Sequence, residues 1–434
     1  MLLRRFALGL LLLVFLPLLQ AQDNLIEVRR GVESVPFLFV SEFDGDSTAE
    51  QRKLIREIFS KDLSSTGEVN IVDVPGASVT IGQEPDFERF RRASLDYAVG
   101  ARIKPTPAGG LELDFVLYSA STTTIDLQQT LSVKTVDSVR NLAHRFANEV
   151  YEFLTKRKGA FDTFIAYVRE TTEAGEPRFE ILISDADGYG ARQVFSSRYP
   201  LSGLAWSHNN RSLAYTSWDK GYPTVYVQEL ATGNRTEIPR RLGVNSDASF
   251  SPDGRSLVLV QSRGFNPDVY VVNLSTKRAE RLAGLNAVEA SPRYSADGNR
   301  VIFTSDRSGS PQLYEIDADG RNERRITFQG NYNADGIYMP SSLRVVAIVG
   351  DGGGYRIGLI DMGSFSMQHL SDRHAEIDGI TMSPNGAVVL YSHATSGGSW
   401  RVSGVSTNGQ AKFQLINPGG GKIYSPAWSW YTSE

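Results

Sequence analysis

The feature that most constrains this chain is a repeat of 44 residues in its C-terminal part. A large side chain followed by a serine or methionine begins each unit, at intervals of 44, 44, 44, 44 and 46 residues. The six large side chains are Trp206, Phe250, Tyr294, Tyr338, Met382 and Trp428. A period of about 20 to 50 residues indicates stacked units that bury their apolar faces against their neighbours. The repeat therefore requires an architecture of equivalent units.

Each unit has the pattern of four short strands. In the third unit, β-rich runs lie at 300–304, 312–317 and 323–328, after a strand that ends at Tyr294. Four strands in about 40 to 45 residues are typical of one blade of a β-propeller. The Ser-Pro-Asp-Gly sequence at 251–254 suits a tight turn, because Pro fixes φ, Asp caps the turn and Gly accepts positive φ. We therefore interpret this serine as part of a turn and not as a nucleophile.

The last unit is incomplete, and this predicts how the ring closes. The chain stops at Glu434 soon after the strand at 425–429, and three strands at 164–168, 178–183 and 192–195 precede the first full unit. One blade would then be shared between both ends, with Trp428 as its closing residue. We predict an all-β six-bladed β-propeller over residues 160–434.

Residues 35–156 predict a separate α/β domain. Amphipathic helices are expected at 49–63 and 137–155, and a short helix at 86–93. The expected strands are 35–43, 69–74, 95–103, 111–118 and 124–133. Residues 156–161 would link this domain to the propeller.

The N-terminus is typical of an exported protein. Arg4 and Arg5 precede an apolar run from Phe6 to Leu19, and the small residue Ala21 follows. This pattern predicts a cleaved signal peptide at 1–21, a periplasmic location and no direct insertion into a membrane. Residues 22–34 would form a flexible N-terminal segment.

Composition and motifs argue against several kinds of chemistry. The chain has no cysteine, and removal of the signal peptide would take two arginines and change the net charge from −4 to −6. The sequence has no basic stripe of the kind that binds nucleic acid. It also lacks the Gly-x-Ser-x-Gly sequence that marks the nucleophile of a hydrolase. The five histidines lack metal-site spacing, and solvated loop positions are the favoured interpretation. We expect no catalytic residue, no metal, no cofactor and a monomer. The histidines are His144, His208, His369, His374 and His393.

Several stretches resemble one known family. They include Glu27-Val28-Arg29, Lys158-Gly159-Ala160-Phe161, Ile165-Ala166-Tyr167-Val168 and Pro426-Ala427-Trp428-Ser429. Their order along the chain resembles the TolB family, periplasmic propellers of the Tol-Pal system with PD40-type repeats. The fourth unit departs from the pattern because it lacks the Pro-Asp-Gly turn, and Leu242 to Ser246 lack the histidine expected there.

The resemblance implies two partners and a cellular role. The propeller would bind the lipoprotein Pal, an N-terminal segment would bind TolA, and colicins would exploit the system. The protein would be a non-enzymatic scaffold that supports outer-membrane integrity and constriction during cell division. The segment for TolA comprises Leu25, Ile26, Glu27, Val28, Arg29, Gly31 and Val32.

The surface expected to bind Pal is the end of the propeller opposite the Ser-Pro-Asp-Gly turns. Loops that enter the innermost strands, and loops between second and third strands, meet at that end. We name these residues the predicted Pal face: Val244, Asn245, Asp247, Glu289, Ala290, Asp306, Arg307, Tyr332, Asn333, His374 and Glu376. A propeller that binds a glycan or a peptidoglycan fragment is the alternative left open.

Overall fold

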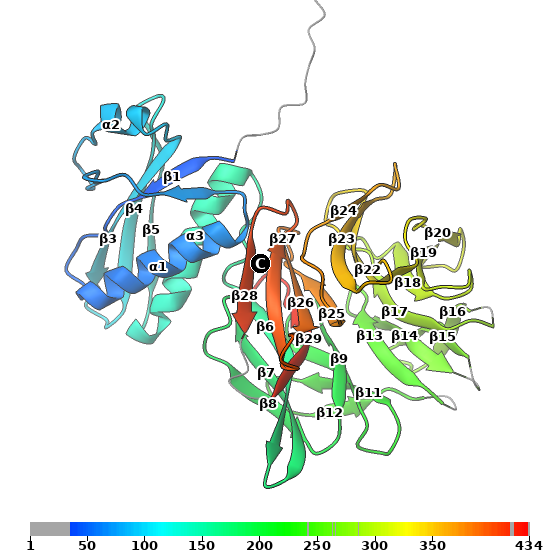
Figure 1. Cartoon of the computed structure of the whole chain (residues 1–434). Helices are drawn as coiled ribbons and strands as arrows, with labels where there is room; N and C mark the ends of the chain where they lie inside the picture. The colour runs from blue at the N-terminus through cyan, green and yellow to red at the C-terminus, as the bar shows by residue number, and fades with distance from the viewer. Residues whose placement is uncertain are drawn as a thin grey trace, which may run out of the picture. The chain divides into compact units, whose positions relative to one another are not determined.

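A computed structural model describes residues 35–240, 243–262, 264, 266–284, 286–416 and 421–432. An N-terminal α/β region precedes six four-stranded sheets, which form the six blades of a β-propeller (Figure 1). The predicted fold class is therefore confirmed. None of the helices among these residues is both long and apolar enough to cross a membrane.

The N-terminal region has one five-stranded sheet in the order β2-β1-β3-β4-β5. The strands are β1 (Phe37–Val40), β2 (Asn70–Val72), β3 (Tyr97–Pro105), β4 (Leu111–Ser119) and β5 (Ile125–Val133). β1 pairs in parallel with β2 and β3, and the other pairs are antiparallel. The expected strands at 35–43 and 69–74 are thus shorter than predicted, although Ser41 and Phe43 remain buried beyond the end of β1.

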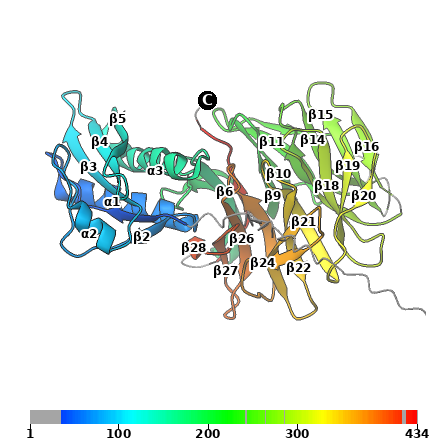
Figure 2. The same ribbon diagram turned by 90° about the horizontal axis from the view of Figure 1, so that it is seen from above.

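Two long helices pack against each other and cover this sheet (Figure 2). The helices of the region are α1 (Ala49–Ser65), α2 (Phe87–Arg92) and α3 (Val139–Thr155), with a 3-10 turn at Val136–Ser138 before α3. Thr48 and Gln51 cap the start of α1 reciprocally, which satisfies two backbone N–H groups. Phe59 of α1 stacks on Phe146 of α3 with ring centroids 4.2 Å apart. Apolar burial between the helices therefore holds this region together.

The six blades follow the repeat. The five blades that are continuous in the chain run from the innermost to the outermost strand in order. The first two of these blades comprise β9 (Leu201–Trp206), β10 (Ser212–Ser217), β11 (Thr224–Glu229) and β12 (Arg235–Glu237), then β13 (Asn245–Phe250), β14 (Ser256–Ser262), β15 (Pro267–Asn273) and β16 (Ala279–Ala283). The next two comprise β17 (Glu289–Tyr294), β18 (Arg300–Ser305), β19 (Gln312–Asp317) and β20 (Arg324–Arg325), then β21 (Tyr332–Tyr338), β22 (Arg344–Gly350), β23 (Tyr355–Asp361) and β24 (Met367–His369). The fifth comprises β25 (Ile377–Met382), β26 (Val388–Ala394), β27 (Trp400–Ser406) and β28 (Lys412–Ile416).

The repeated serine is used inside its turn. The Ser251 hydroxyl donates to Asp253 Oδ1 at 2.6 Å and accepts from the Ser256 N–H at 3.0 Å. Ser295 and Ser383 make the equivalent bonds. In the fourth unit, Ser341 takes a positive φ of 52° and the hairpin forms without the Pro-Asp-Gly sequence. The serine therefore stabilises the turn between the first two strands of a blade.

The remaining blade joins both ends of the propeller chain. Its strands are β29 (Lys422–Trp428), β6 (Phe164–Glu173), β7 (Glu176–Asp185) and β8 (Arg192–Ser197), in that order. β29 pairs with β6 in antiparallel fashion, with Trp428 opposite Ile165. Trp428 Nε1 donates to Thr163 Oγ1 at 2.7 Å, and Trp206 Nε1 donates to the Ala427 carbonyl at 3.0 Å. Thr163 precedes β6 of the same blade, whereas Trp206 ends β9 of the next blade. The Trp428 N–H also donates to Thr381 Oγ1 of β25, in the preceding blade, at 2.9 Å. The closing strand is thus bonded within its own blade and to both neighbouring blades.

The N-terminal region contacts the propeller at the end that carries the turns. Asn385, in the turn after β25, donates to the Lys158 carbonyl at 3.1 Å. Asn408, in the turn after β27, donates to the Gly67 carbonyl at 2.8 Å. A Cβ on Gly67 would lie 2.8 Å from Asn408 Oδ1, so this close approach requires glycine. The opposite end of the propeller carries the loops of the predicted Pal face.

We expect Trp428→Ala to lower the free energy of unfolding by about 3 kcal/mol, near the lower limit for a core tryptophan because this side chain is only half-buried. Trp428→Phe should cost about 1 kcal/mol, because it loses the bond to Thr163 but keeps most apolar contacts. Denaturant unfolding measures both values. Unchanged stability in Trp428→Ala and in a chain ending before Ser425 would contradict this account of closure.

Candidate partner-binding site at the propeller channel

The innermost strand of every blade is interrupted at one equivalent position. Strand pairing shifts there by one or more residues, as in a β-bulge, and the residue at the shift has a positive φ. These bulge residues are Gly203 (61°), Asp247 (54°), Ser291 (48°), Asp335 (52°), Gly379 (68°) and Ser425 (50°). A positive φ is unfavourable for residues other than glycine, so the surrounding sheet must impose this conformation at four of the six positions.

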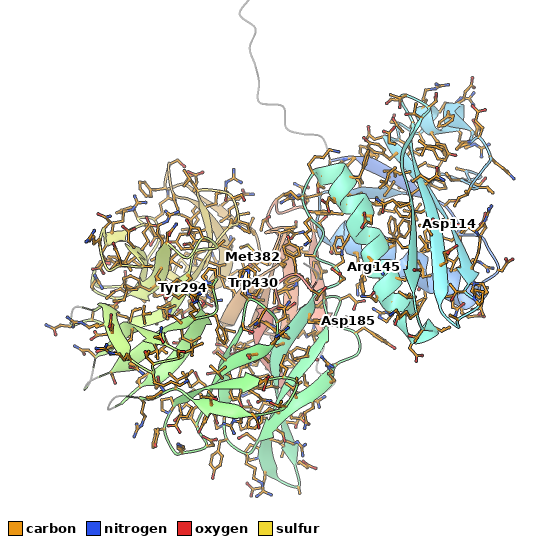
Figure 3. The ribbon with its side chains drawn as sticks, turned by 180° about the vertical axis from the view of Figure 1, so that it is seen from behind. Asp114, Arg145, Asp185, Tyr294, Met382 and Trp430 are labelled. Atoms are coloured by element: carbon orange, nitrogen blue, oxygen red, sulfur yellow. The ribbon has the colours of Figure 1, made fainter. Side chains whose placement is uncertain are left out.

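The six bulge residues line one central cavity. It has a volume of about 440 Å³ and is also lined by Arg293, Asp306, Tyr332 and Asp378. Tyr294 and Met382 belong to innermost strands that surround it (Figure 3). Cavities of roughly 300 to 1,000 Å³ are large enough for a peptide loop or a small ligand. The bulges therefore build a recess from six separate segments of the chain.

An ion pair ties three blades together inside this cavity. Arg293 of β17 pairs with Asp335 of β21 at 2.8 Å and donates to the Ile380 carbonyl of β25 at 3.1 Å. The Ile380 N–H in turn donates to Asp335 Oδ2 at 3.0 Å. The Asp335 carboxylate is therefore shared between a guanidinium and a backbone donor, which fixes its orientation.

Two further carboxylates make the cavity acidic. Removal from bulk water raises the pKa of Asp247, and the negative charge of Asp335 adds to this effect. Asp378 remains in contact with solvent in the channel, but its partial removal from bulk water raises its pKa to about 6, and the negative charges of Asp335 and Asp247 add to this effect. With Asp306 and Asp335, four carboxylates among the described residues line a cavity that contains one guanidinium, that of Arg293. A partner with N–H donors or basic groups would complement this recess.

Four residues of the predicted Pal face line the cavity itself. They are Asp247, Ala290, Asp306 and Tyr332. Asp306 Oδ1 also accepts from the Val288 N–H at 2.9 Å, which orders the loop before β17. Tyr332 packs against Tyr355 with ring centroids 5.1 Å apart. These four side chains thus form the part of the predicted face that meets the channel.

Three other residues of the predicted face are buried and make polar contacts within a blade or between two blades. Asn245, Glu289 and Asn333 lie at equivalent positions of β13, β17 and β21 and are at most 1% exposed. Asn245 accepts from Gln261 at 3.1 Å, and Asn333 donates to Gln312 at 2.9 Å. Glu289 pairs with Arg307 at 2.8 Å. These side chains support the loops and offer little surface to a partner.

The last residues of the predicted face lie in loops at its rim. Val244 is half-buried, and its N–H donates to Ser262 Oγ at 2.8 Å. Glu376 is exposed. His374 packs on His393 with ring centroids 4.0 Å apart. Burial and the neighbouring His393 lower the pKa of His374 to about 4, so this ring is neutral at pH 7.

The interpretation of the histidines as solvated was wrong for two of them. His144 is 2% exposed on α3, and His393 is 9% exposed on β26. His144 lies on the packed face of α3, and the apolar stripe of this helix is the sequence feature that could have predicted its burial. The 44-residue spacing relates Asp335 to Asp247 of the predicted face and could have located it, whereas Arg293 and Asp378 lie outside this series. No sequence signal marked the bulge that turns these residues inward.

The segment expected to bind TolA, Leu25 to Val32, lies outside the described residues. The signal peptide predicted at 1–21 does so too. Both therefore remain predictions from the sequence.

Comparisons with known proteins agree over nearly the whole chain. Residues 24–124 match the TolB amino-terminal domain, and residues 151–432 match the TolB beta propeller domain. Proteins described as "Tol-Pal system protein TolB" from Xanthomonas oryzae pv. oryzae and Xanthomonas campestris pv. campestris are each 36% identical over 433 residues, which cover 98% of this chain and 97% of the relative. The crystal structure of TolB from Acinetobacter baumannii matches with a TM-score of 0.82 at 29% identity, covering 92% of this chain and 98% of that one.

The raised pKa of Asp378 predicts a pH-dependent effect of Asp378→Asn on stability. The folded protein holds this proton more tightly than the unfolded chain, whose carboxyl titrates at about 3.9. Stability from the protonated group is therefore full below about pH 4 and is lost as the pH rises through about 6. Asn avoids this loss, so melting temperatures should show the variant more stable than the unchanged protein at pH 8 and similar to it at pH 4.

The control is Asp319→Asn, which alters an exposed turn carboxylate. It should give the same small difference at both pH values. A difference for Asp378→Asn that does not change with pH would contradict the prediction.

Proposed function

Because this chain belongs to the TolB family of Tol-Pal system proteins, we propose that it is a non-enzymatic periplasmic scaffold that binds Pal and TolA. In this role it links Pal at the outer membrane and peptidoglycan to TolA of the inner-membrane complex. It supports outer-membrane integrity and constriction during cell division, and colicins are foreign partners. The protein acts as a monomer and reaches the periplasm through a cleaved signal peptide.

The observation that carries this proposal is the match over both regions in their order along the chain. Relatives named as Tol-Pal system proteins are matched over 98% of this chain, so the match includes the N-terminal region as well as the repeat. A propeller repeat alone would not distinguish this family from other propellers. The proposed domain bounds are 35–156 for the α/β domain and 160–434 for the propeller.

The open end of the propeller is the surface proposed for Pal. At the other end, Asn385 and Asn408 of the propeller donate hydrogen bonds to the carbonyls of Lys158 and Gly67. The open end presents an acidic recess surrounded by loops with aromatic and charged side chains. The negative charge of the recess would complement a partner that brings N–H donors or basic groups, and such complementarity favours specific association. A loop of Pal that brings N–H donors to Asp335 and Asp378 would fit the recess.

The repeated serines support a non-enzymatic role. In the described part of the chain, Ser251, Ser295 and Ser383 each donate to the acidic or amide side chain two residues later. None of these three bonds joins the serine to a histidine, which an activated nucleophile needs.

We expect rim and channel substitutions to weaken Pal binding at least about tenfold, which is about 1.4 kcal/mol. The variants are Glu376→Lys on the exposed rim and Ala290→Arg at the cavity wall. Both avoid the buried residues Asn245, Glu289 and Asn333, whose replacement would destabilise the blades. Titration calorimetry with the soluble domain of Pal measures the affinity, and thermal melting checks the fold.

The matched control is Asp319→Lys, a charge reversal in a turn at the opposite end of the propeller. It should leave Pal affinity unchanged. Loss of binding in this control alone would reverse the face, and binding of isolated peptidoglycan without Pal would favour the glycan-binding alternative.

The N-terminal segment is proposed to bind TolA. Leu25, Ile26, Val28 and Val32 are apolar, and such a segment can add to the edge of a partner's sheet. Arg29 and Arg30 suit an acidic partner, and Gly31 permits a hinge. If Pal binding disfavours exposure of the segment, TolA binding must disfavour Pal to the same degree.

A mature chain without residues 22–34 should lose TolA binding in a pull-down assay. Its circular dichroism should be unchanged, because the described α/β sheet begins at Phe37. Its Pal affinity should change only modestly. Full retention of TolA binding would move the contact to the α/β domain.

A further inference from the structure

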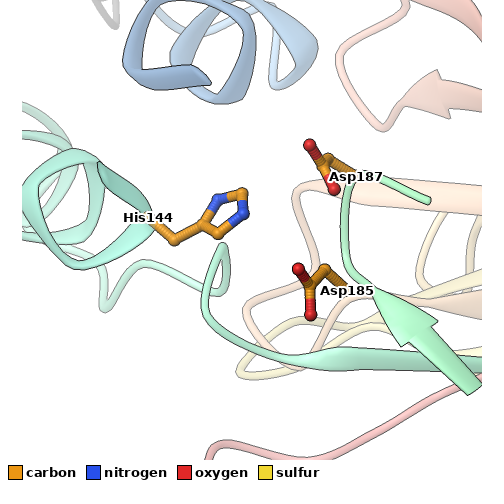
Figure 4. A group of neighbouring side chains, drawn as sticks. All are labelled: His144, Asp185 and Asp187. Atoms are coloured by element: carbon orange, nitrogen blue, oxygen red, sulfur yellow. The ribbon is translucent and has the colours of Figure 1, made fainter. Parts of the chain in front are cut away.

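A cluster of polar side chains lies between α3 and the turn that follows β7. His144 of α3 faces Asp185 and Asp187 of this turn (Figure 4). One ligand atom from each of these residues lies within 4.8 Å of the others. His144 is 2% exposed, and the Asp187 side chain is 10% exposed. Asp185 is more accessible, with 35% of its side chain exposed. Two carboxylates and an imidazole thus converge at a site that is buried on the side of His144 and open to solvent at Asp185.

The imidazole of His144 has one nitrogen engaged and one without a partner. Nδ1 lies 2.7 Å from Asp62 Oδ2 of α1, and both groups are buried. Nε2 is buried and has no hydrogen-bond partner in the described part of the chain. A carboxylate that accepts from Nδ1–H leaves the lone pair of the neutral ring on Nε2. A buried ring nitrogen without a hydrogen bond lowers the stability of the folded state, so a ligand bound to it would remove this free-energy cost.

We propose that His144 Nε2, Asp185 and Asp187 bind a divalent transition-metal ion of the Zn²⁺ type at the junction of the α/β domain and the propeller. Imidazole and carboxylate ligands suit Zn²⁺, which takes three protein ligands and a water in open sites. Asp62 would then act as the carboxylate that orients a metal-bound histidine, an arrangement found at most such ligands. This inference does not depend on the partners proposed above.

The geometry requires a modest contraction. Ligand atoms around a tetrahedral Zn²⁺ ion lie roughly 3.3 Å apart, given bonds of about 2.0–2.1 Å. The group spans 4.8 Å at most, so a shift of the turn toward α3 would close it. A recess of about 350 Å³, lined by Lys61, Arg140, Asp187 and Tyr189, opens beside the cluster and offers a path for the ion.

Arg140 is the competing cation at this site. Its guanidinium pairs with Asp187, while its Nε lies 3.7 Å from Asp185 and is buried without a hydrogen bond. The guanidinium also lies 3.9 Å from the centre of the Tyr189 ring. The ion would replace the Arg140 contact with Asp187, and Arg140 could keep its contact with Tyr189.

A second copy of the same turn shows that the turn alone does not create the site. The sequence Asp-Ala-Asp-Gly recurs at 317–320, after β19. Asp185 and Asp317 accept equivalent backbone bonds from Gly188 and Gly320 at 2.9 and 2.8 Å. The Asp319 side chain is 58% exposed, against 10% for Asp187. The α/β domain therefore makes the difference, because it supplies His144 and buries the turn.

The test is a titration of the full-length, untagged, chelator-treated protein with Co²⁺, followed by displacement with Zn²⁺. We expect one Co²⁺ per chain, with the visible absorption of a four-coordinate site, and a higher melting temperature with Zn²⁺. Asp185→Asn and Asp187→Asn should each weaken binding at least about tenfold, and Asp62→Asn by about 10- to 100-fold. In Asp187→Asn, the amide oxygen can still accept the Tyr189 N–H. Asp185 bonds to Tyr189 and Gly188 through its backbone, which Asp185→Asn leaves unchanged, so both variants should fold.

Two control variants distinguish this cluster from metal binding elsewhere on the chain. Asp319→Asn, in the second copy of the turn, should bind Co²⁺ like the unchanged protein. His393→Ala should do so as well, since it alters the His374–His393 pair and not the cluster. Absence of Co²⁺ binding at about 0.1 mM would mean that Nε2 carries a proton instead, and would overturn the proposal. Binding that survives both Asp185→Asn and Asp187→Asn, or that is lost in His393→Ala, would overturn it too.

Discussion

The pairing of β29 with β6 is the interaction on which the rest of the structure depends. Each blade buries its apolar faces mainly against its two neighbours, and an open array would leave an exposed strand edge and an uncovered apolar face at each end. The bond from Trp428 to Thr163 holds the last strand in its own blade, and the bonds from Trp206 to Ala427 and from Trp428 to Thr381 join it to the two neighbouring blades. Closure of the ring by a strand from the far end of the chain therefore stabilises all six blades together.

The two ends of the closed propeller have different surroundings. One end carries the turns between the first two strands of each blade, and there Asn385 and Asn408 donate hydrogen bonds to the α/β region and its linker. At the other end, the six bulge residues line an acidic recess in which Arg293 and the Ile380 N–H hold the Asp335 carboxylate in place. A rigid wall around this recess means that a partner meets donors and acceptors already in place, which reduces the ordering cost of binding.

Much of this arrangement could be predicted from the sequence. The 44-residue period located the innermost strands, and the large side chain before each turn, Met382 in the fifth unit and an aromatic in the others, located the residues between blades. The buried roles of Asn245, Glu289 and Asn333 were not predicted, because a polar residue at the start of a strand can face a partner or a neighbouring strand equally well. The inward direction of Asp335 and Asp378 also escaped prediction, since it depends on a one-residue shift in strand pairing that reverses which side a residue faces.

The sequence by itself determined the blades, their number and the strand that closes the ring, because these follow from local turn chemistry and a fixed period. Only the tertiary structure decided which of two identical Asp-Ala-Asp-Gly turns is buried. Asp319 remains in solvent, whereas its counterpart Asp187, together with Asp185, lies against His144 of a helix more than forty residues earlier in the chain. The environment of a carboxylate depends on what packs over it, and the packing of one domain on another is not encoded in any single repeat.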